Sequence, residues 1–142
     1  MRIIEQDQTD AIDTTSLHVP SMDLVVGGDV IYNQCHMYVG DTTPESRANW
    51  IVALERLAAL NPKIAIAGHK KTGAPDTPSI IEASKQYLGD FSRLKEATCS
   101  DHELYDAMTE LYPDRVSHQA WLMFGFGRPN INSTRGGRRV DF

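Results

Sequence analysis

The sequence predicts an α/β fold in which helices cover a mixed sheet and the C-terminal part is helical. An apolar strand, a long amphipathic helix and a second apolar strand follow one another between residues 23 and 67. This order is typical of a crossover connection, which makes the two strands parallel. Residues 76–126 show only helical periodicity. With 142 residues, 41% of them hydrophobic, the chain can bury a core without disulfides.

The first strands precede the long helix. Residues 2–6 are typical of an edge strand, and two β-rich runs follow at residues 16–19 and 23–26. Pro20 and its neighbouring serine separate these two runs and indicate a hairpin turn. We therefore expect an antiparallel hairpin ahead of the crossover.

The crossover helix has clear start and stop signals. Thr43 is a suitable N-cap, and Pro44 occupies the first helical position. Pro62 marks the end of the helix, and residues 63–67 then form a short strand. The apolar residues that recur at helical spacing are Trp50, Leu54, Leu57 and Leu60.

The C-terminal part predicts two helices and a short third one. Pro78 opens the first helix, and residues 100–103 form a capping box at the start of the second. Residues 118–126 predict the short helix, so that the domain spans residues 1–126 and residues 127–142 form a flexible tail. The residues expected on the inner faces of the first two helices are Ile80, Ile81, Tyr87, Leu88, Phe91, Leu94, Leu104, Met108 and Leu111.

Two candidate functional residues follow the two apolar strands. Gly27 and Gly28 permit a turn that leaves Asp29 at a strand end, and His69 follows the later strand. If the strands are parallel, both side chains emerge at the same edge of the sheet. An Asp and a His that meet there can bind zinc or act as a general acid and base. Taken singly, an Asp in this position is also a common cap residue, and a single His is a common packed residue.

The overall charge disfavours several classes of partner. Fourteen basic and nineteen acidic residues give a net charge of −5, which argues against nonspecific binding to nucleic acid or to an anionic membrane. Arg135, Arg138 and Arg139 form a local basic tail that can contact phosphate, although a solvated terminus is the alternative. Because the chain is acidic overall and has no interleaved aromatic residues there, nucleic-acid binding is the weakest of the functions considered. No apolar run is long enough to span a bilayer, and acidic residues come too early for a signal peptide. We therefore expect a cytoplasmic protein with free thiols at Cys35 and Cys99.

Three segments together resemble a known family. Residues 17–33 (LHVPSMDLVVGGDVIYN), 42–50 (TTPESRANW) and 64–70 (IAIAGHK) are similar to a branch of the metallo-β-lactamase-fold hydrolases. The resemblance extends over residues 5–112. It implies an αββα sandwich built from two similar halves, of which this chain resembles the C-terminal half only.

The resemblance also implies a set of site residues. Asp29 is then the ligand that bridges two metal ions, usually zinc, and His69 is a ligand of the second ion. The implied reaction is hydrolysis of an ester, amide or similar bond in a small-molecule substrate. A His at the position of His36 often lines the site in this family, although a surface loop residue is the alternative. Tyr32 can donate a hydrogen bond to a substrate oxygen, although a packed tyrosine is the alternative.

The departures from the family pattern leave two main functions open. The motif His-x-His-x-Asp-His is absent, and Gln8 aligns with a further His ligand in the loop before the hairpin. Asp29 and His69 alone fall short of the three protein ligands of a typical catalytic zinc. The chain is then either part of a zinc-dependent hydrolase completed by a missing N-terminal half or another chain, or a non-catalytic remnant. In the second case it acts as a homodimer, which hides the apolar sheet face that the missing half would cover.

Overall fold

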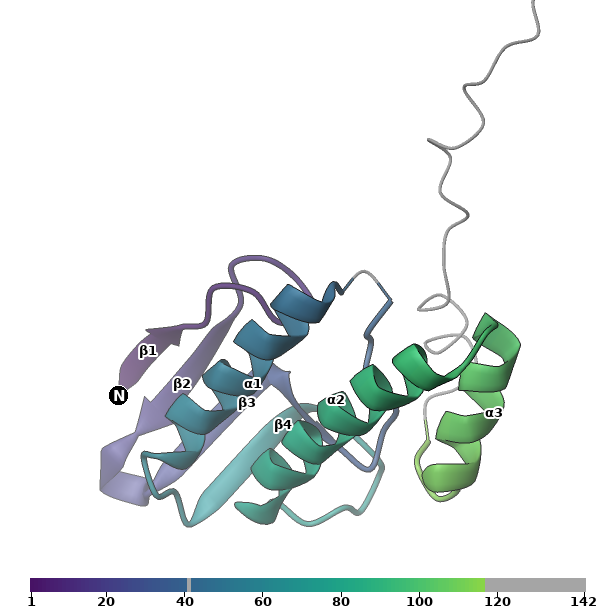
Figure 1. Ribbon diagram of the computed structural model, residues 1–142. Helices are drawn as coiled ribbons and strands as arrows, with labels where there is room; N and C mark the ends of the chain where they lie inside the picture. Colours follow the sequence, from purple (N-terminus) through teal and green to yellow (C-terminus); the bar gives the residue numbers. More distant parts are fainter. Residues whose placement is uncertain (41, 117–142) are drawn as a thin grey trace, which may run out of the picture.

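A computed structural model describes residues 1–40 and 42–116, which form a four-stranded sheet with helices across one face (Figure 1). The strand order is β1-β2-β3-β4, with β1, β2 and β3 antiparallel and β4 parallel to β3. The mixed α/β fold, the hairpin and the parallel crossover are therefore confirmed. The predicted helix at 118–126 and the tail at 127–142 lie outside the described residues. The elements are β1 (Arg2–Glu5), β2 (Thr15–Val19), β3 (Leu24–Asn33), α1 (Pro44–Ala58), β4 (Ile64–Lys70), α2 (Ser79–Ala97) and α3 (Asp101–Leu111).

Local hydrogen bonds fix where the helices begin. At α1 the Thr43 hydroxyl accepts from the Ser46 amide at 3.1 Å, and the Ser46 hydroxyl accepts from the Thr43 amide at 2.7 Å. This reciprocal pair confirms the predicted N-cap. At α3 the Ser100 hydroxyl accepts from the Glu103 amide, but the Glu103 carboxylate accepts from the Cys99 amide instead of that of Ser100. The predicted capping box is thus only half formed.

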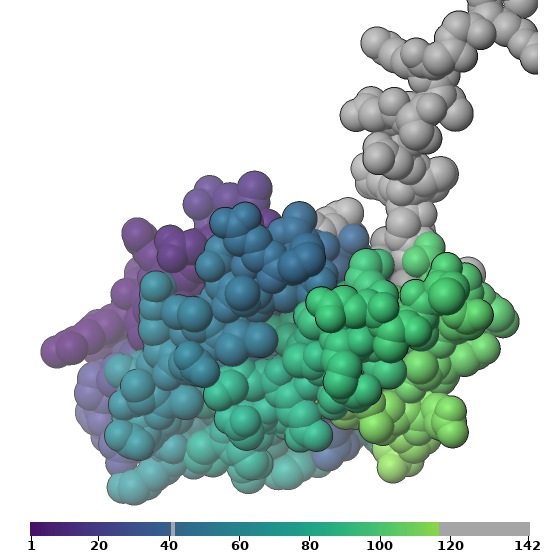
Figure 2. All heavy atoms as spheres, viewed as in Figure 1, coloured from purple at the N-terminus to yellow at the C-terminus, as the bar shows by residue number. Residues whose placement is uncertain are grey.

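The hydrophobic core lies between the helices and the sheet. In Figure 2 the side chains of α1 and α2 pack against each other along this side of the molecule. Trp50 is fully buried, and its indole Nε1 donates to the carbonyl oxygen of Val30 at 2.9 Å, which ties α1 to β3. The predicted inner faces are otherwise buried or half-buried, except that Leu111 is 46% exposed. None of the helices within the described ranges is long and apolar enough to cross a bilayer.

Both parallel strands run further than the sequence predicted. β3 continues to Asn33 and β4 continues to Lys70, so Asp29 and His69 lie inside strands instead of after them. The glycines that suggested a strand end instead permit an irregularity within the strand. Gly28 adopts φ +57°, and the register of β3 against β4 shifts on both sides of it.

Gly28 and Gly68 allow a close approach of β3 and β4. A Cβ atom placed on Gly68 would lie 2.5 Å from the carbonyl oxygen of Gly28. Only a glycine therefore tolerates this spacing without a backbone shift. The close approach occurs directly beside Asp29 and His69, so it contributes to the position of both side chains.

The second face of the sheet carries apolar side chains of its own. Because side chains alternate along a strand, the buried Val25 and Ala65 point toward the helices, and their neighbours point away. Strand pairing places the latter in two rows, Ile3–Leu17–Val26–Ile66 and Val19–Leu24–Ile64. We call these seven residues the open face. They keep partial exposure, which reaches 71% at Ile3 and 38% at Ile64.

Candidate metal centre

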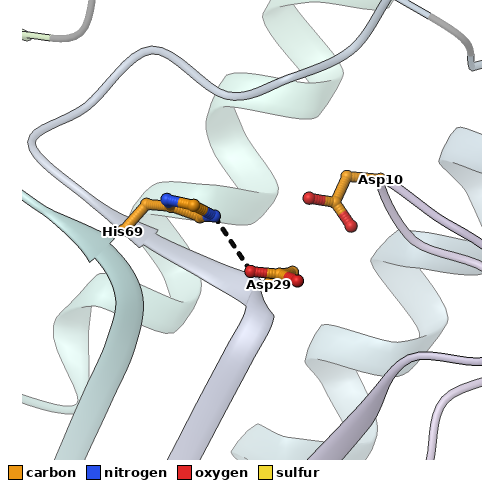
Figure 3. A group of neighbouring side chains, drawn as sticks. All are labelled: Asp10, Asp29 and His69. Carbon is orange, nitrogen blue, oxygen red and sulfur yellow. Dashed lines mark hydrogen bonds and ion pairs between the residues drawn. The ribbon is translucent and has the colours of Figure 1, made fainter.

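Three side chains from separate segments converge at the carboxyl-terminal part of β3 and β4. Asp10 comes from the β1–β2 loop, Asp29 from β3 and His69 from β4. One potential ligand atom from each side chain lies within 4.8 Å of the other two. Figure 3 shows the Asp10 carboxylate directed toward the other pair. Within the described residues this group therefore has the composition of a metal site, with two carboxylates and one imidazole.

The parallel strands bring Asp29 and His69 together. His69 Nε2 lies 2.9 Å from Asp29 Oδ1, drawn as the dashed line in Figure 3. The side chains are 35% exposed for His69 and 53% exposed for Asp29. The pair is thus accessible to an ion or a small molecule while two strands hold its backbone.

Tyr32 supports the group from the protein interior. Its hydroxyl donates to Asp10 Oδ2 at 2.8 Å, and its ring stacks on the His69 ring with centroids 4.7 Å apart. Burial raises the pKa of the Asp10 carboxyl above its ordinary value, with a smaller contribution from Asp29, while the Tyr32 hydrogen bond opposes the rise. Burial beside Asp10 also raises the pKa of Tyr32, which keeps its hydroxyl a donor.

Asp10 is the member of the Asp10–Asp29–His69 group that the sequence did not predict. Gln8, which was aligned with a ligand position, pairs with Ile12 in an isolated bridge within the loop. The loop is closed by a hydrogen bond from the Gln6 amide to the Thr14 carbonyl, and Asp10 reaches the site two residues after Gln8. The acidic character of this loop was a visible signal. The sequence did not show which acidic residue of the loop reaches the site, because the contact that holds Asp10 comes from the distant Tyr32.

The two residues expected to line the site occupy different environments. His36 is only 5% exposed, and its Nδ1 lies 3.0 Å from the hydroxyl of Tyr87 in α2. It is not a member of the Asp10–Asp29–His69 group. Tyr32 does belong to this group, but it is fully buried, and its hydroxyl bonds to Asp10. In this conformation Tyr32 packs beneath the site instead of facing a substrate.

The donor set is suitable for a divalent ion. Ligand distances of about 2.0–2.2 Å in a tetrahedral site separate the ligand atoms by roughly 3.3–3.6 Å. The 2.9 Å contact between Asp29 and His69 must open slightly to admit an ion, and the widest separation, at most 4.8 Å, must close. Rotation of the Asp29 and His69 side chains, which are 53% and 35% exposed, can supply such shifts. Two carboxylates also balance the charge of a divalent cation.

Comparison with solved structures identifies the fold. A metallo-β-lactamase family protein from Thermus thermophilus superposes with a TM-score of 0.58 and 20% identity, over 88% of this chain and 40% of that one. VMB-1 gives 0.52 and 15% identity, over 63% and 41%. The metallo-β-lactamase FIM-1 from Pseudomonas aeruginosa, in its mono-zinc form, gives 0.48 and 21% identity, over 62% and 38%.

The predicted metallo-β-lactamase fold is thereby confirmed. The chain spans about two fifths of the length of the solved structures that it matches. No protein-family model matches the sequence, and no curated protein matches it. The likeness therefore concerns the fold, while the chemistry rests on the side chains of this chain.

Proposed function

We propose that this chain supplies three ligands to the metal centre of a zinc-dependent hydrolase with the metallo-β-lactamase fold. The observation that carries the proposal is the convergence of Asp10, Asp29 and His69 within 4.8 Å. Three protein ligands are the number that a catalytic zinc typically has, with a further position open. With Asp10, the number of candidate protein ligands rises from the two that the sequence indicated to three.

Each residue has a distinct task in this proposal. Asp10, Asp29 and His69 would each contribute one ligand atom. Asp29 and His69 form the more accessible pair, and Asp29 would be the bridge if a second ion binds. Asp10 adds a second negative charge, and the Tyr32 hydroxyl holds its carboxylate in position. When bound, the metal supplies a water of lowered pKa and polarises the bond to be cleaved.

The proposed substrate is a small molecule with an ester, amide or similar bond. Ligands for a second metal ion would come from an N-terminal half or from another chain, since the described residues offer one such group. We place the protein in the cytoplasm, where its two free thiols, Cys35 and Cys99, would stay reduced.

Metal binding by the purified chain tests the proposal. After removal of metal with a chelator, titration with Zn²⁺ followed by calorimetry should show about one ion per chain. Asp29→Ala and Asp10→Ala should each lower the affinity at least tenfold, because each removes a charged ligand. Thermal melts of Asp29→Ala without metal should change little, since Asp29 is exposed.

The matched control is Asp76→Ala. Asp76 is also acidic and pairs with Lys70, the residue after His69, but it does not belong to the Asp10–Asp29–His69 group. Its removal should leave zinc binding unchanged. Full zinc occupancy in both Asp10→Ala and Asp29→Ala would overturn the ligand assignment.

A second candidate function is a dimeric interaction module without catalysis. The observation that favours it is the open face, which is a continuous apolar surface on two paired rows of strand residues. Two copies stacked through this face would each supply the layer that the other lacks. A homodimer without bound zinc would support this function against the first, and a zinc-binding homodimer would support both.

A further inference from the structure

A groove beside the metal centre has a cation in its wall. It lies between the loop that follows β4, the first turns of α2 and the segment that follows α3, and its volume is about 350 Å³. This volume is within the range of small-ligand sites. The residues that matter for its chemistry are Thr77, Ser79, Ile80, Leu111, Asp114 and Arg115.

Arg115 is held between two aromatic rings. Its guanidinium lies 4.7 Å from the ring centroid of Tyr87 and 4.9 Å from that of Tyr112. Nη1 donates to the Cys35 carbonyl at 2.7 Å, and Nη2 is 3.3 Å from the Ala83 carbonyl. These contacts fix the plane of the guanidinium at the groove wall.

The positive charge of Arg115 has no carboxylate partner within residues 1–40 and 42–116. The carboxylates of Asp90 and Asp76 pair with Arg93 and Lys70 respectively. Burial lowers the pKa of the Arg115 guanidinium below its ordinary value, and only tyrosines and a cysteine oppose this effect. Arg115 is half-buried, and a charge-assisted hydrogen bond to a carboxylate or phosphate is stronger than its present bonds to neutral carbonyls.

The remaining walls define what else the ligand must carry. Thr77 and Ser79 place two hydroxyls, 2.7 Å apart, at the start of α2. Ile80 and Leu111 provide an apolar surface, and Leu111 is 46% exposed. Asp114 also lines the groove and is the one acidic side chain among its described lining residues that opposes an anion there.

We propose that this groove binds a small molecule with an anionic group and an apolar body. The anionic group, a carboxylate or a phosphate, lies against Arg115, and the apolar body lies against Ile80 and Leu111. The lining of this groove contains none of the three residues of the proposed metal centre, and Tyr32 lies between the two. The fully buried side chain of Tyr32 bonds to Asp10 on the metal side, whereas the Tyr32 amide and carbonyl bond to Ser84 of α2.

Nuclear magnetic resonance titrations of the full 142-residue chain test the proposal. Benzoate, acetate and inorganic phosphate are added separately at constant ionic strength, with a chelator present so that the metal centre cannot contribute. Saturable shifts should appear at the Thr77, Ser79 and Arg115 amides. Benzoate should bind more tightly than acetate if the apolar wall takes part, and tighter binding of phosphate than of either would assign the phosphate form of the ligand.

Two variants change the charge of the groove in opposite directions. Arg115→Gln should weaken benzoate binding at least tenfold, because a charge-assisted contact is lost. Asp114→Asn should strengthen it about twofold or more, because a nearby like charge is removed. Arg93→Gln is the control, since Arg93 is an exposed arginine of α2 that pairs with Asp90, and it should have no effect.

Several outcomes would overturn the site. Shifts that stay linear in anion concentration and spread over surface lysines would show only nonspecific binding. Unchanged benzoate affinity in a folded Arg115→Gln protein would show that the Arg115 guanidinium does not bind the anion. Should Arg115→Gln fail to fold, the Asp114→Asn result decides alone, because Asp114 is exposed and its contact with Lys71 is through its backbone carbonyl.

Discussion

The two faces of the sheet differ in what covers them. On one face α1 and α2 cover the sheet (Figure 1), and Val25 and Ala65 of the sheet and Trp50 of α1 are fully buried. On the other face Ile64 is 38% exposed and Ile3 is 71% exposed. The same strands therefore contribute to a buried core on one side and to a partly exposed apolar surface on the other.

The side chains of β4 differ in size between the two faces of the sheet. Ala65 and Ala67 point toward the helices and leave room for them to approach, whereas Ile64 and Ile66 point toward the open face. A strand with one solvated face usually alternates apolar and polar residues, and a strand buried on both faces is apolar throughout. The larger residues of β4 thus lie on the side that no described helix covers.

The largest expected effect belongs to the covered face. Trp50→Ala should lower the free energy of unfolding by about 3–5 kcal/mol, because it leaves a large cavity and removes the donor to the Val30 carbonyl. Urea unfolding followed by circular dichroism measures the change. Trp50→Phe retains most of the volume and should cost less. A wild-type midpoint for Trp50→Ala would show that α1 does not close the core through this residue.

A smaller effect is expected where β3 and β4 approach most closely. Gly68→Ala should cost about 1–3 kcal/mol, because the added Cβ meets the Gly28 backbone at 2.5 Å and must push the strands apart. It should also weaken zinc binding, since Asp29 and His69 flank this contact. Urea unfolding and zinc titration of the variant measure the two effects.

The matched control for this prediction is Gly89→Ala. Gly89 lies within α2, and a Cβ there would meet no atom within 4 Å. This substitution should stabilise the protein by about 0.5–1 kcal/mol, because glycine is unfavourable in a helix. Equal effects of the two substitutions would contradict the steric account of Gly68.

Local signals determined how much of this fold the sequence could predict. The cap at Thr43 and the inner face of α2 depend on neighbours three or four residues away, so their patterns were visible. The meeting of Asp29 and His69 followed from the parallel crossover alone. The strand ends were wrong because glycine terminates some strands and bends others. Asp10 was missed because its position depends on Tyr32, which lies 22 residues further along the chain.

A substitution on the open face should have the smallest effect on the stability of a single chain. It also gives the sharpest test of the comparison between the two faces of the sheet. Ile64→Lys should change the unfolding free energy of the monomer by less than about 1 kcal/mol, because Ile64 is already 38% exposed. If the open face pairs with a second copy, the same substitution should dissociate the dimer in analytical ultracentrifugation, because it places a charge in an apolar interface.

Ile12→Lys is the control for this measurement. Ile12 is 73% exposed in the β1–β2 loop, outside the open face, so the change in charge and residue type is the same while the place differs. Dissociation by Ile64→Lys but not by Ile12→Lys would assign the dimer to the open face. A wild-type chain that sediments as a monomer at every concentration would exclude self-pairing, and the apolar rows would then require a different covering layer.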